Sequence, residues 1–285
     1  MIYVSSSCIK SKNIKEVIIF LAENGIKNIE LSGGIDFYSD LKDDLISLKK
    51  EHKLNYLVHN YFPPPKEHFV LNLASLDNTK WQKCIDFLKN SIEFSLDLGV
   101  SKYSMHAGFY VDPHVYELGK AFVTKNYSNK KRALERFVSG YEIVKIFANG
   151  EIDLYIENNV VSFDNYKNYS FNPFMLTTFQ EYEELKTFID FNLLLDIGHL
   201  KVSANTLNLD FDAELEKFLP HTNYIHLSDN DGKNDLNLGI KTTAELLVLL
   251  KKNVLKSKII TLETYIPIAE IKRNIEILKS IISDG

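Results

Sequence analysis

The stretch Leu193–His199, which is Leu-Leu-Leu-Asp-Ile-Gly-His, is the part of this 285-residue chain that decides the fold. Three consecutive leucines form an apolar run typical of a strand that is buried on both faces. The run ends at Asp196, and His199 follows three residues later. Asp196 either caps a following helix, which leaves His199 as an ordinary loop residue, or it presents a metal-binding carboxylate at the tip of a buried strand. The rest of the chain must decide between these interpretations.

Short apolar runs alternate with segments of helical periodicity along almost the whole sequence. This alternation is typical of parallel α/β architecture. Eight such units predict one α/β domain over residues 1–285, a single (β/α)8 TIM barrel, since such barrels commonly need about 250 residues. The expected strands are Ile2–Ser5, Asn28–Leu31, Asn55–His59, Lys102–His106, Asp153–Glu157, Asn192–Asp196, Tyr224–Leu227 and Ile259–Glu263. The expected helices lie near Ile14–Asn24, Leu41–Glu51, Thr79–Leu98, Lys130–Ala148, Phe179–Phe188, Ala213–Phe218, Thr242–Asn253 and Ile268–Ile282.

Composition indicates an ordinary globular protein, with 45% hydrophobic and 25% charged residues. The formal net charge of -5 is spread over mixed acidic and basic residues, so there is no electrostatic reason to expect a nucleic-acid partner. Cys8 and Cys84 are too few for a disulfide framework. With no apparent leader and no membrane-spanning run, we expect a cytoplasmic protein, and the sequence leaves open whether it forms a homo-oligomer.

Side chains of metal-ligand type end six successive expected strands. Each one alone has a simpler explanation, such as a hydrogen-bonded packing histidine, a solvated loop carboxylate or a helix cap. Their coincidence favours a common site, because the carboxyl ends of the strands form the functional face of a barrel. The residues are His59, His106, Glu157, Asp196 with His199 beyond it, His226 and Glu263.

Two glutamates, one aspartate and one histidine would suit a hard or borderline divalent ion such as Mn, Mg, Co or Zn. Open coordination positions could accept a hydroxyl and a carbonyl oxygen of a small-molecule substrate, and the metal would stabilise the charge that develops on oxygen.

Four segments carry a resemblance to a known group of proteins. They are Asp196-Ile-Gly-His199, Ile225-His-Leu-Ser-Asp229, Asp235-Leu-Asn-Leu-Gly239 and Leu262-Glu263. Together with Glu157, they resemble the xylose isomerase-like TIM barrel superfamily, which includes ketose epimerases, inosose and hydroxypyruvate processing enzymes and the endonuclease IV group.

The resemblance implies that Glu157, Asp196, His226 and Glu263 hold one metal ion. In the sugar-converting members, it further implies that Glu157 and Glu263 exchange protons with carbon on opposite faces of the substrate. His199 would contact a substrate oxygen, and His59 and His106 are further candidates for substrate binding. Glu30 matches a position that is often acidic in such barrels, where we expect a buried structural carboxylate.

Resemblance to the endonuclease IV group implies a different metal content. His59 and His106 match the histidines that bind a second zinc there, with Glu157 bridging, and we include Asp235 among the candidate ligands of a second ion. A third zinc would need His199 and an Asp-x-His pair, but this sequence has Asp235-Leu236-Asn237. An amide is a poorer ligand for zinc than an imidazole, so the third metal is in doubt.

The leading hypothesis is a divalent-metal-dependent isomerase or epimerase of a sugar or sugar derivative. Aromatic residues after the strands could cover a sugar ring, namely Phe62, Phe109, Tyr110, Phe163, Tyr166 and Tyr265. The alternatives are a metal-dependent phosphodiesterase that acts on abasic DNA and a non-catalytic carbohydrate-binding barrel. No glycine-rich phosphate loop is evident and the expected rim is poor in lysine, so the phosphorylation state of the sugar stays open.

Overall fold

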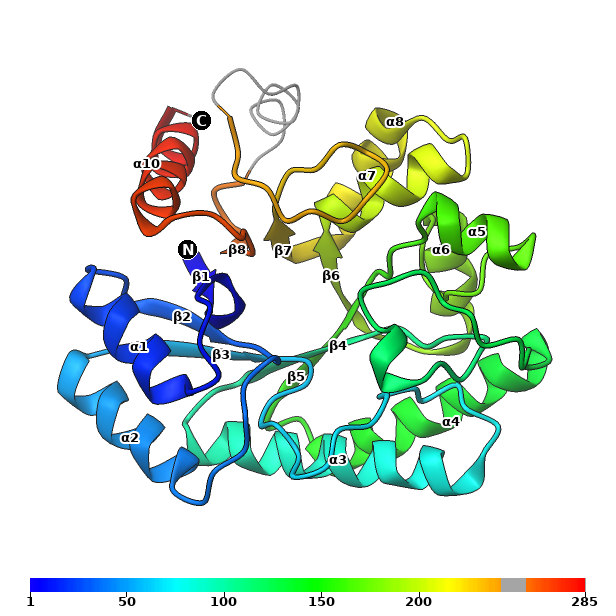
Figure 1. Ribbon diagram of the computed structural model, residues 1–285, viewed down its shortest axis with the longest axis horizontal. Coiled ribbons are helices and arrows are strands. Elements are labelled where there is room, and N and C mark those ends of the chain that lie inside the picture. The colour runs from blue at the N-terminus through cyan, green and yellow to red at the C-terminus, as the bar shows by residue number, and fades with distance from the viewer. Residues whose placement is uncertain (242–254, 285) are drawn as a thin grey trace.

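A computed structural model describes residues 1–241 and 255–284 of the chain. Eight parallel strands form a closed barrel in chain order, and β8 closes the barrel by pairing with β1 (Figure 1). The predicted (β/α)8 fold is therefore confirmed. The strands are β1 Ile2–Ser5, β2 Asn28–Leu31, β3 Asn55–His59, β4 Lys102–His106, β5 Asp153–Glu157, β6 Asn192–Asp196, β7 Thr222–Leu227 and β8 Ile259–Leu262. Six match the predicted bounds, β7 starts two residues earlier, and β8 ends one residue earlier.

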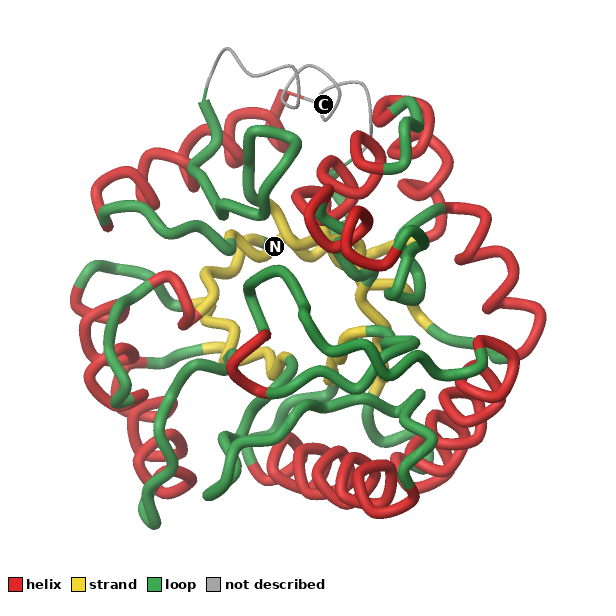
Figure 2. Tube along the Cα trace, turned by 45° about the vertical axis from the view of Figure 1, so that its right-hand side comes forward, coloured by secondary structure: helices red, strands yellow, loops and turns green. Residues whose placement is uncertain are grey.

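Helices surround the ring of strands, and loops extend across the barrel opening (Figure 2). Seven helices correspond to predicted ones: α1 Ile14–Glu23, α2 Leu41–His52, α3 Asn78–Asp97, α4 Lys130–Ala148, α6 Phe179–Phe188, α8 Phe211–Phe218 and α10 Ile268–Asp284. The helix predicted at Thr242–Asn253 lies outside the described residues. Within the described part of the chain, no helix has the length and apolar character needed to cross a membrane.

Among the described residues, two α-helices and three 3-10 helices were not predicted. The α-helices are α5 Phe163–Tyr169 and α7 Ile197–Thr206, and the 3-10 helices are η1 Ser6–Cys8, η2 Val115–Glu117 and η3 Leu219–His221. Helix α7 begins directly after β6, so the strand delivers its last residue to a helix N-terminus without an intervening loop.

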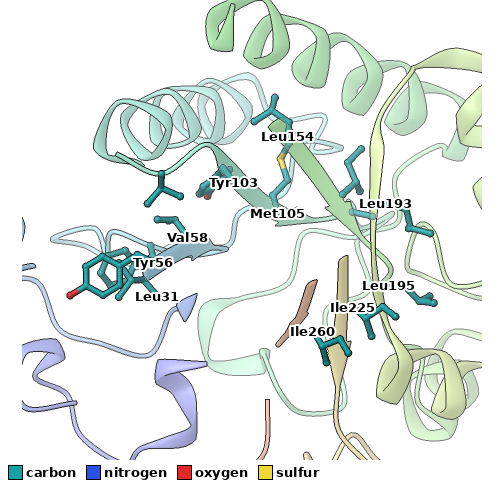
Figure 3. Close-up of a cluster of buried hydrophobic side chains, with 14 of the residues drawn as sticks. Leu31, Tyr56, Val58, Tyr103, Met105, Leu154, Leu193, Leu195, Ile225 and Ile260 are labelled. Carbon is teal, nitrogen blue, oxygen red and sulfur yellow. The ribbon is translucent and has the colours of Figure 1, made fainter. Parts of the chain in front are cut away.

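The main hydrophobic core lies between the barrel and the helices. Leu193 and Leu195 of β6 belong to this core, together with outward-facing residues of the neighbouring strands (Figure 3). Since successive residues of a strand point to opposite faces, Leu194 points into the barrel. There it packs in a separate cluster with Tyr3, Leu57, Tyr155 and Tyr224.

The same alternation positions the candidate site. Two residues beyond Leu57, Tyr155, Leu194 and Tyr224 come His59, Glu157, Asp196 and His226, which therefore share the inward face of their strands. A shift of one residue in any strand would direct its ligand-type side chain into the outer core. The apolar floor of the barrel and the candidate site above it thus follow from one strand register.

Candidate metal centre and pocket

Glu157 lies at the centre of the candidate site and is fully buried at the end of β5. Its Oε2 atom is 3.2 Å from His59 Nε2 and 3.1 Å from His106 Nδ1. Its Oε1 atom is 3.3 Å from His226 Nδ1. Burial raises the pKa of Glu157, but the surrounding imidazoles outweigh burial and hold this pKa well below its usual value. The two oxygens of one carboxylate therefore face two different sets of histidines.

His226 is held between two acidic groups. Its Nε2 atom lies 3.0 Å from Glu30 Oε1, and its Nδ1 atom lies 3.1 Å from Glu263 Oε2. Burial lowers the pKa of His226, whereas Glu30 and Glu157 raise it well above its usual value. The surroundings of this imidazole thus favour positive charge, either as a proton or as a metal ion.

Glu30 is the buried structural carboxylate that the sequence led us to expect, and it orients His226. It is fully buried and accepts hydrogen bonds from the Tyr224 hydroxyl and from Thr261 Oγ1, the latter at 2.8 Å. An ionised carboxylate only accepts hydrogen bonds, so Nε2 of His226 must donate to it. This fixes the imidazole with Nδ1 toward Glu157, the arrangement in which a second carboxylate supports a metal-binding histidine.

Asp196 caps helix α7 and also contributes to the cluster. Its Oδ1 atom accepts a hydrogen bond of 2.7 Å from the backbone N–H of His199. Its Oδ2 atom lies 3.9 Å from both His226 Nδ1 and His199 Nε2. The predicted capping by Asp196 is therefore confirmed, whereas His199 lies in α7 and not in a loop as that interpretation expected. Capping leaves the second oxygen of Asp196 directed into the cluster.

Asp235 contacts His199 at the edge of the cluster. Its Oδ2 atom lies 3.4 Å from His199 Nε2, whereas the carboxylate in contact with both His59 and His106 is that of Glu157. The assignment of Asp235, with His59 and His106, as a possible ligand of a second ion stays a prediction. His199 donates from Nδ1 to the carbonyl oxygen of Asn158 at 2.8 Å, which leaves Nε2 directed toward Asp235.

Asn237 is the residue that, by the resemblance to the endonuclease IV group, puts a third zinc in doubt, and its backbone conformation gives a separate reason for an asparagine here. It adopts a φ of 47° in the left-handed region, which asparagine tolerates better than most residues. Its carbonyl oxygen accepts a hydrogen bond of 2.7 Å from the N–H of Tyr265. Asn237 therefore joins the loops that follow β7 and β8.

The donor set fits a divalent cation. Both carboxylate oxygens of Glu157 and the Nδ1 atoms of His106 and His226 are buried and have no hydrogen-bond partner among the described residues. Burying polar atoms without a hydrogen-bond partner costs free energy, so these atoms are expected to pair with a bound ion or water. Two groups share Glu157 and have ligand atoms close enough to bind one ion: Glu157 with Asp196 and His226, and Glu157 with His59 and His106. Glu30 with His59 and His226 forms a third such group.

Charge supports the same conclusion. Burial, Glu157 and Asp235 raise the pKa of Asp196 to about 7, against the opposing effect of His199. Crowded buried carboxylates of this kind are stabilised by a nearby cation. Glu263, the fourth predicted ligand, follows β8 directly and lies outside the three groups named above. Its Oε1 accepts from Ser7 Oγ at 3.1 Å, and its side chain is 18% exposed.

A pocket of about 940 Å³ leads to this cluster. His59, His106 and Glu263 line its inner end, so three predicted site residues are within reach of a bound molecule. The rest of the lining comes mainly from the connections that follow β1, β2 and β3, and much of it bears hydroxyl or amide groups. These polar residues are Ser6, Ser7, Ser11, Ser32, Asn60, Tyr61 and Tyr265.

Most of these lining residues were not predicted from the sequence. Ser6 and Ser7 follow the first strand directly, which is a signal that they belong to the functional face. Of the aromatic residues expected at the barrel mouth, Tyr265 lines the pocket. Phe62 does not fit that expectation, because it is fully buried and packs against Phe94 in the outer core.

The fold and the cluster together define a (β/α)8 barrel with a candidate metal centre at the carboxyl ends of its strands. The sequence profile of the family described as "Xylose isomerase-like TIM barrel" matches residues 18–281. The chain therefore belongs to this family.

Solved structures of several enzymes resemble the whole chain. A D-tagatose 3-epimerase-like protein aligns with a TM-score of 0.75 and 20% identity, over 99% of this chain and 97% of that one. D-psicose 3-epimerase from Clostridium cellulolyticum, solved with D-tagatose, aligns with a TM-score of 0.71 and 13% identity over 99% of both chains. Endonuclease IV from Thermus thermophilus aligns with a TM-score of 0.62 and 15% identity, over 100% of this chain and 99% of that one. At these identities the likeness establishes the fold alone. No curated protein matches the sequence.

Proposed function

We propose that this protein is a divalent-metal-dependent isomerase or epimerase of a sugar or sugar derivative. The observation that carries the proposal is the pocket of about 940 Å³, whose inner end reaches Glu263, His59 and His106 and whose walls are rich in hydroxyl groups. A polyhydroxylated small molecule can exchange hydrogen bonds with such walls, and a few converging polar groups would fix its orientation. Similarity to structures titled as epimerases of D-tagatose and D-psicose agrees with this substrate class.

Glu157, Asp196, His226 and Glu263 are the residues that would hold the metal. A divalent ion there would polarise a substrate carbonyl and make the neighbouring carbon-bound proton more acidic. Of these four residues, Glu263 alone lines the pocket. Glu157 lies beneath His59 and His106, with its Oε2 atom within 3.2 Å of a ring nitrogen of each.

Glu263 is the candidate base. Burial raises its pKa, but His226 outweighs this effect and lowers the pKa of Glu263 to about 2. The carboxylate is therefore ionised at neutral pH and can accept a proton from the substrate carbon, while the electron pair of the broken C–H bond moves into the carbonyl. Glu157 is the proposed partner on the opposite face, where it would take up a proton from solvent and pass it to the carbon as the electron pair returns from the carbonyl oxygen. His59, His106 and His199 would hydrogen-bond substrate oxygens.

Exchange of a carbon-bound proton tests this proposal. Metal-loaded protein would be incubated in D2O with a panel of ketoses, aldoses and inososes, and deuterium incorporation followed by NMR. We expect exchange at the carbon next to the carbonyl in at least one substrate, and its loss in Glu263→Gln and Glu157→Gln. Glu23→Gln is the matched control, because Glu23 is exposed at the end of α1. No exchange with any member of the panel would contradict the mechanism.

A two-ion phosphodiesterase is the second candidate, and one specific observation favours it. The two oxygens of Glu157 face different histidines, as a carboxylate that bridges two metal ions would. Paired ions about 3.5–4 Å apart are typical of enzymes that cleave phosphodiesters. Metal analysis distinguishes the candidates, since one ion per chain supports the isomerase. Two or more ions together with incision of an abasic DNA duplex would support the phosphodiesterase.

A further inference from the structure

The pocket has ends of opposite electrical character. Its inner end contains Glu263, the one carboxylate among the described residues that line the pocket. Its outer end is lined by Lys10 and Lys12, which lie in the connection between β1 and α1. The rim was expected to be poor in lysine, because the sequence alone does not show that these two side chains share a cavity with the strand ends.

Both lysines have N–H groups that are free to donate hydrogen bonds to a bound molecule. Lys12 Nζ donates one hydrogen bond of 3.0 Å to the carbonyl oxygen of Gly34, and an ammonium group has three N–H donors. Neither Lys10 nor Lys12 lies within 4.0 Å of a carboxylate oxygen in the described part of the chain. The nearby carboxylate of Glu16 accepts a hydrogen bond of 2.9 Å from the Ser11 hydroxyl. Asp36 is exposed, and its backbone N–H donates to the carbonyl oxygen of Lys12.

The backbone that carries these lysines is held in place from both sides. Upstream, Ser6 Oγ accepts a hydrogen bond of 2.9 Å from the N–H of Ser32, which joins the connection after β1 to that after β2. Downstream, the Asn13 side chain caps α1 by accepting from the N–H of Lys15 at 3.0 Å. The short segment between Ser6 and Asn13 therefore presents its lysines to the pocket from an anchored backbone.

We propose that the outer end of the pocket binds an anionic group of the substrate, a phosphate or a carboxylate, through Lys10 and Lys12. The inference rests on the proposed function and narrows its substrate class to sugars or sugar derivatives that carry a negative charge away from the reacting carbon. The volume of about 940 Å³ is near the upper end of the range of roughly 300–1,000 Å³ for small-molecule sites. It leaves room for a sugar with an appended anionic group.

Calorimetric titration of the metal-loaded protein tests this subsite with three probes: D-fructose, D-fructose 6-phosphate and D-glucuronate. We expect at least one anion to bind roughly tenfold or more tightly than D-fructose, as charge-assisted hydrogen bonds allow. A preference for the phosphate ester or for the uronate identifies which anion the site accepts. The double variant Lys10→Gln/Lys12→Gln should abolish the preference and leave D-fructose binding unchanged.

Lys15→Gln is the matched control. Lys15 is a nearby lysine that pairs with Asp44 at 2.9 Å and does not line the pocket, so this variant should keep the preference. Equal binding of all three probes, or no binding of either anion, would overturn the proposal. So would an anion preference that survives in the double variant, because the anion would then bind at the metal cluster. Proton exchange reports on the metal cluster and Glu263, whereas the anion preference in binding reports on Lys10 and Lys12, so the proposed function and the anion subsite can fail separately.

Discussion

Replacement of Glu30 by glutamine should weaken metal binding without removing any metal ligand. Glu30 accepts hydrogen bonds from Tyr224, Thr261 and His226 inside the barrel. The two hydroxyl groups can rotate to accept from the glutamine amide, but His226 Nε2 can accept only if its proton moves to Nδ1. Since Nδ1 faces Glu157 and Glu263, a proton there would compete directly with a metal ion.

Loss of such a supporting carboxylate typically costs about 10- to 100-fold in metal affinity, which corresponds to about 1.4–2.7 kcal/mol. We expect Glu30→Gln to fall in this range when measured by competition with a chromophoric chelator. Thermal unfolding of the metal-free variant would show whether the barrel is intact.

Tyr155→Phe is the control for this measurement. It removes a hydroxyl from the same interior cluster, where Tyr155 Oη lies 3.0 Å from Asn223 Oδ1, and it does not touch His226. We expect its metal affinity to remain that of the wild type. If Glu30→Gln bound metal as tightly as the wild type in an intact fold, the role assigned to Glu30 would be wrong.

Three further substitutions test other parts of the structure. The Thr124 hydroxyl and three backbone amides outweigh burial and lower the pKa of Glu117 from 4.5 to about 2. Its contribution to stability is therefore present above about pH 4.5 and is lost as the pH falls toward 2, so Glu117→Gln should flatten the dependence of Tm on pH between about 5 and 2.5. Leu195→Ala should lower the free energy of unfolding by about 2–5 kcal/mol in urea titrations, because Leu195 is fully buried in the outer core. Gly198→Ala should lower both Tm and metal affinity, since its Cβ would lie 2.6 Å from Ser228 Oγ. If the measured quantity for one of these variants equalled that of the wild type, the role assigned to that residue would be wrong.

The strands could be predicted closely because a parallel barrel buries both faces of each strand. The run Leu193–Leu195 is apolar throughout, since alternate residues pack in the outer core and inside the barrel. The ligand-type residues interrupt such runs at the carboxyl ends, where the interior opens. Strand bounds and inward-facing residues therefore followed from the same pattern, and His59, Glu157 and His226 do lie together.

Loop geometry could not be predicted in the same way. The lysines at positions 10 and 12 share a pocket with Glu263 only because β1 pairs with β8 and closes the barrel. The contact of Asp235 with His199 could not be predicted either, because Asp235 lies in the loop after β7. Phe62 follows a strand that ends in the site, yet the chain turns it into the outer core.

Helix α7 was missed because the sequence Asp196-Ile-Gly-His199 was treated as either a cap or a ligand-bearing strand end. One carboxylate performs the capping and faces the cluster, since its two oxygens point in different directions. Capping holds Oδ1 on the N–H of His199 and thereby limits the rotation of Oδ2, which faces His226. Gly198 permits this close packing, because a Cβ there would also lie 3.2 Å from Asp196 Oδ1. The start of the helix and the geometry of the candidate metal centre are therefore coupled, and a change that frays the first turn of α7 should also disturb metal binding.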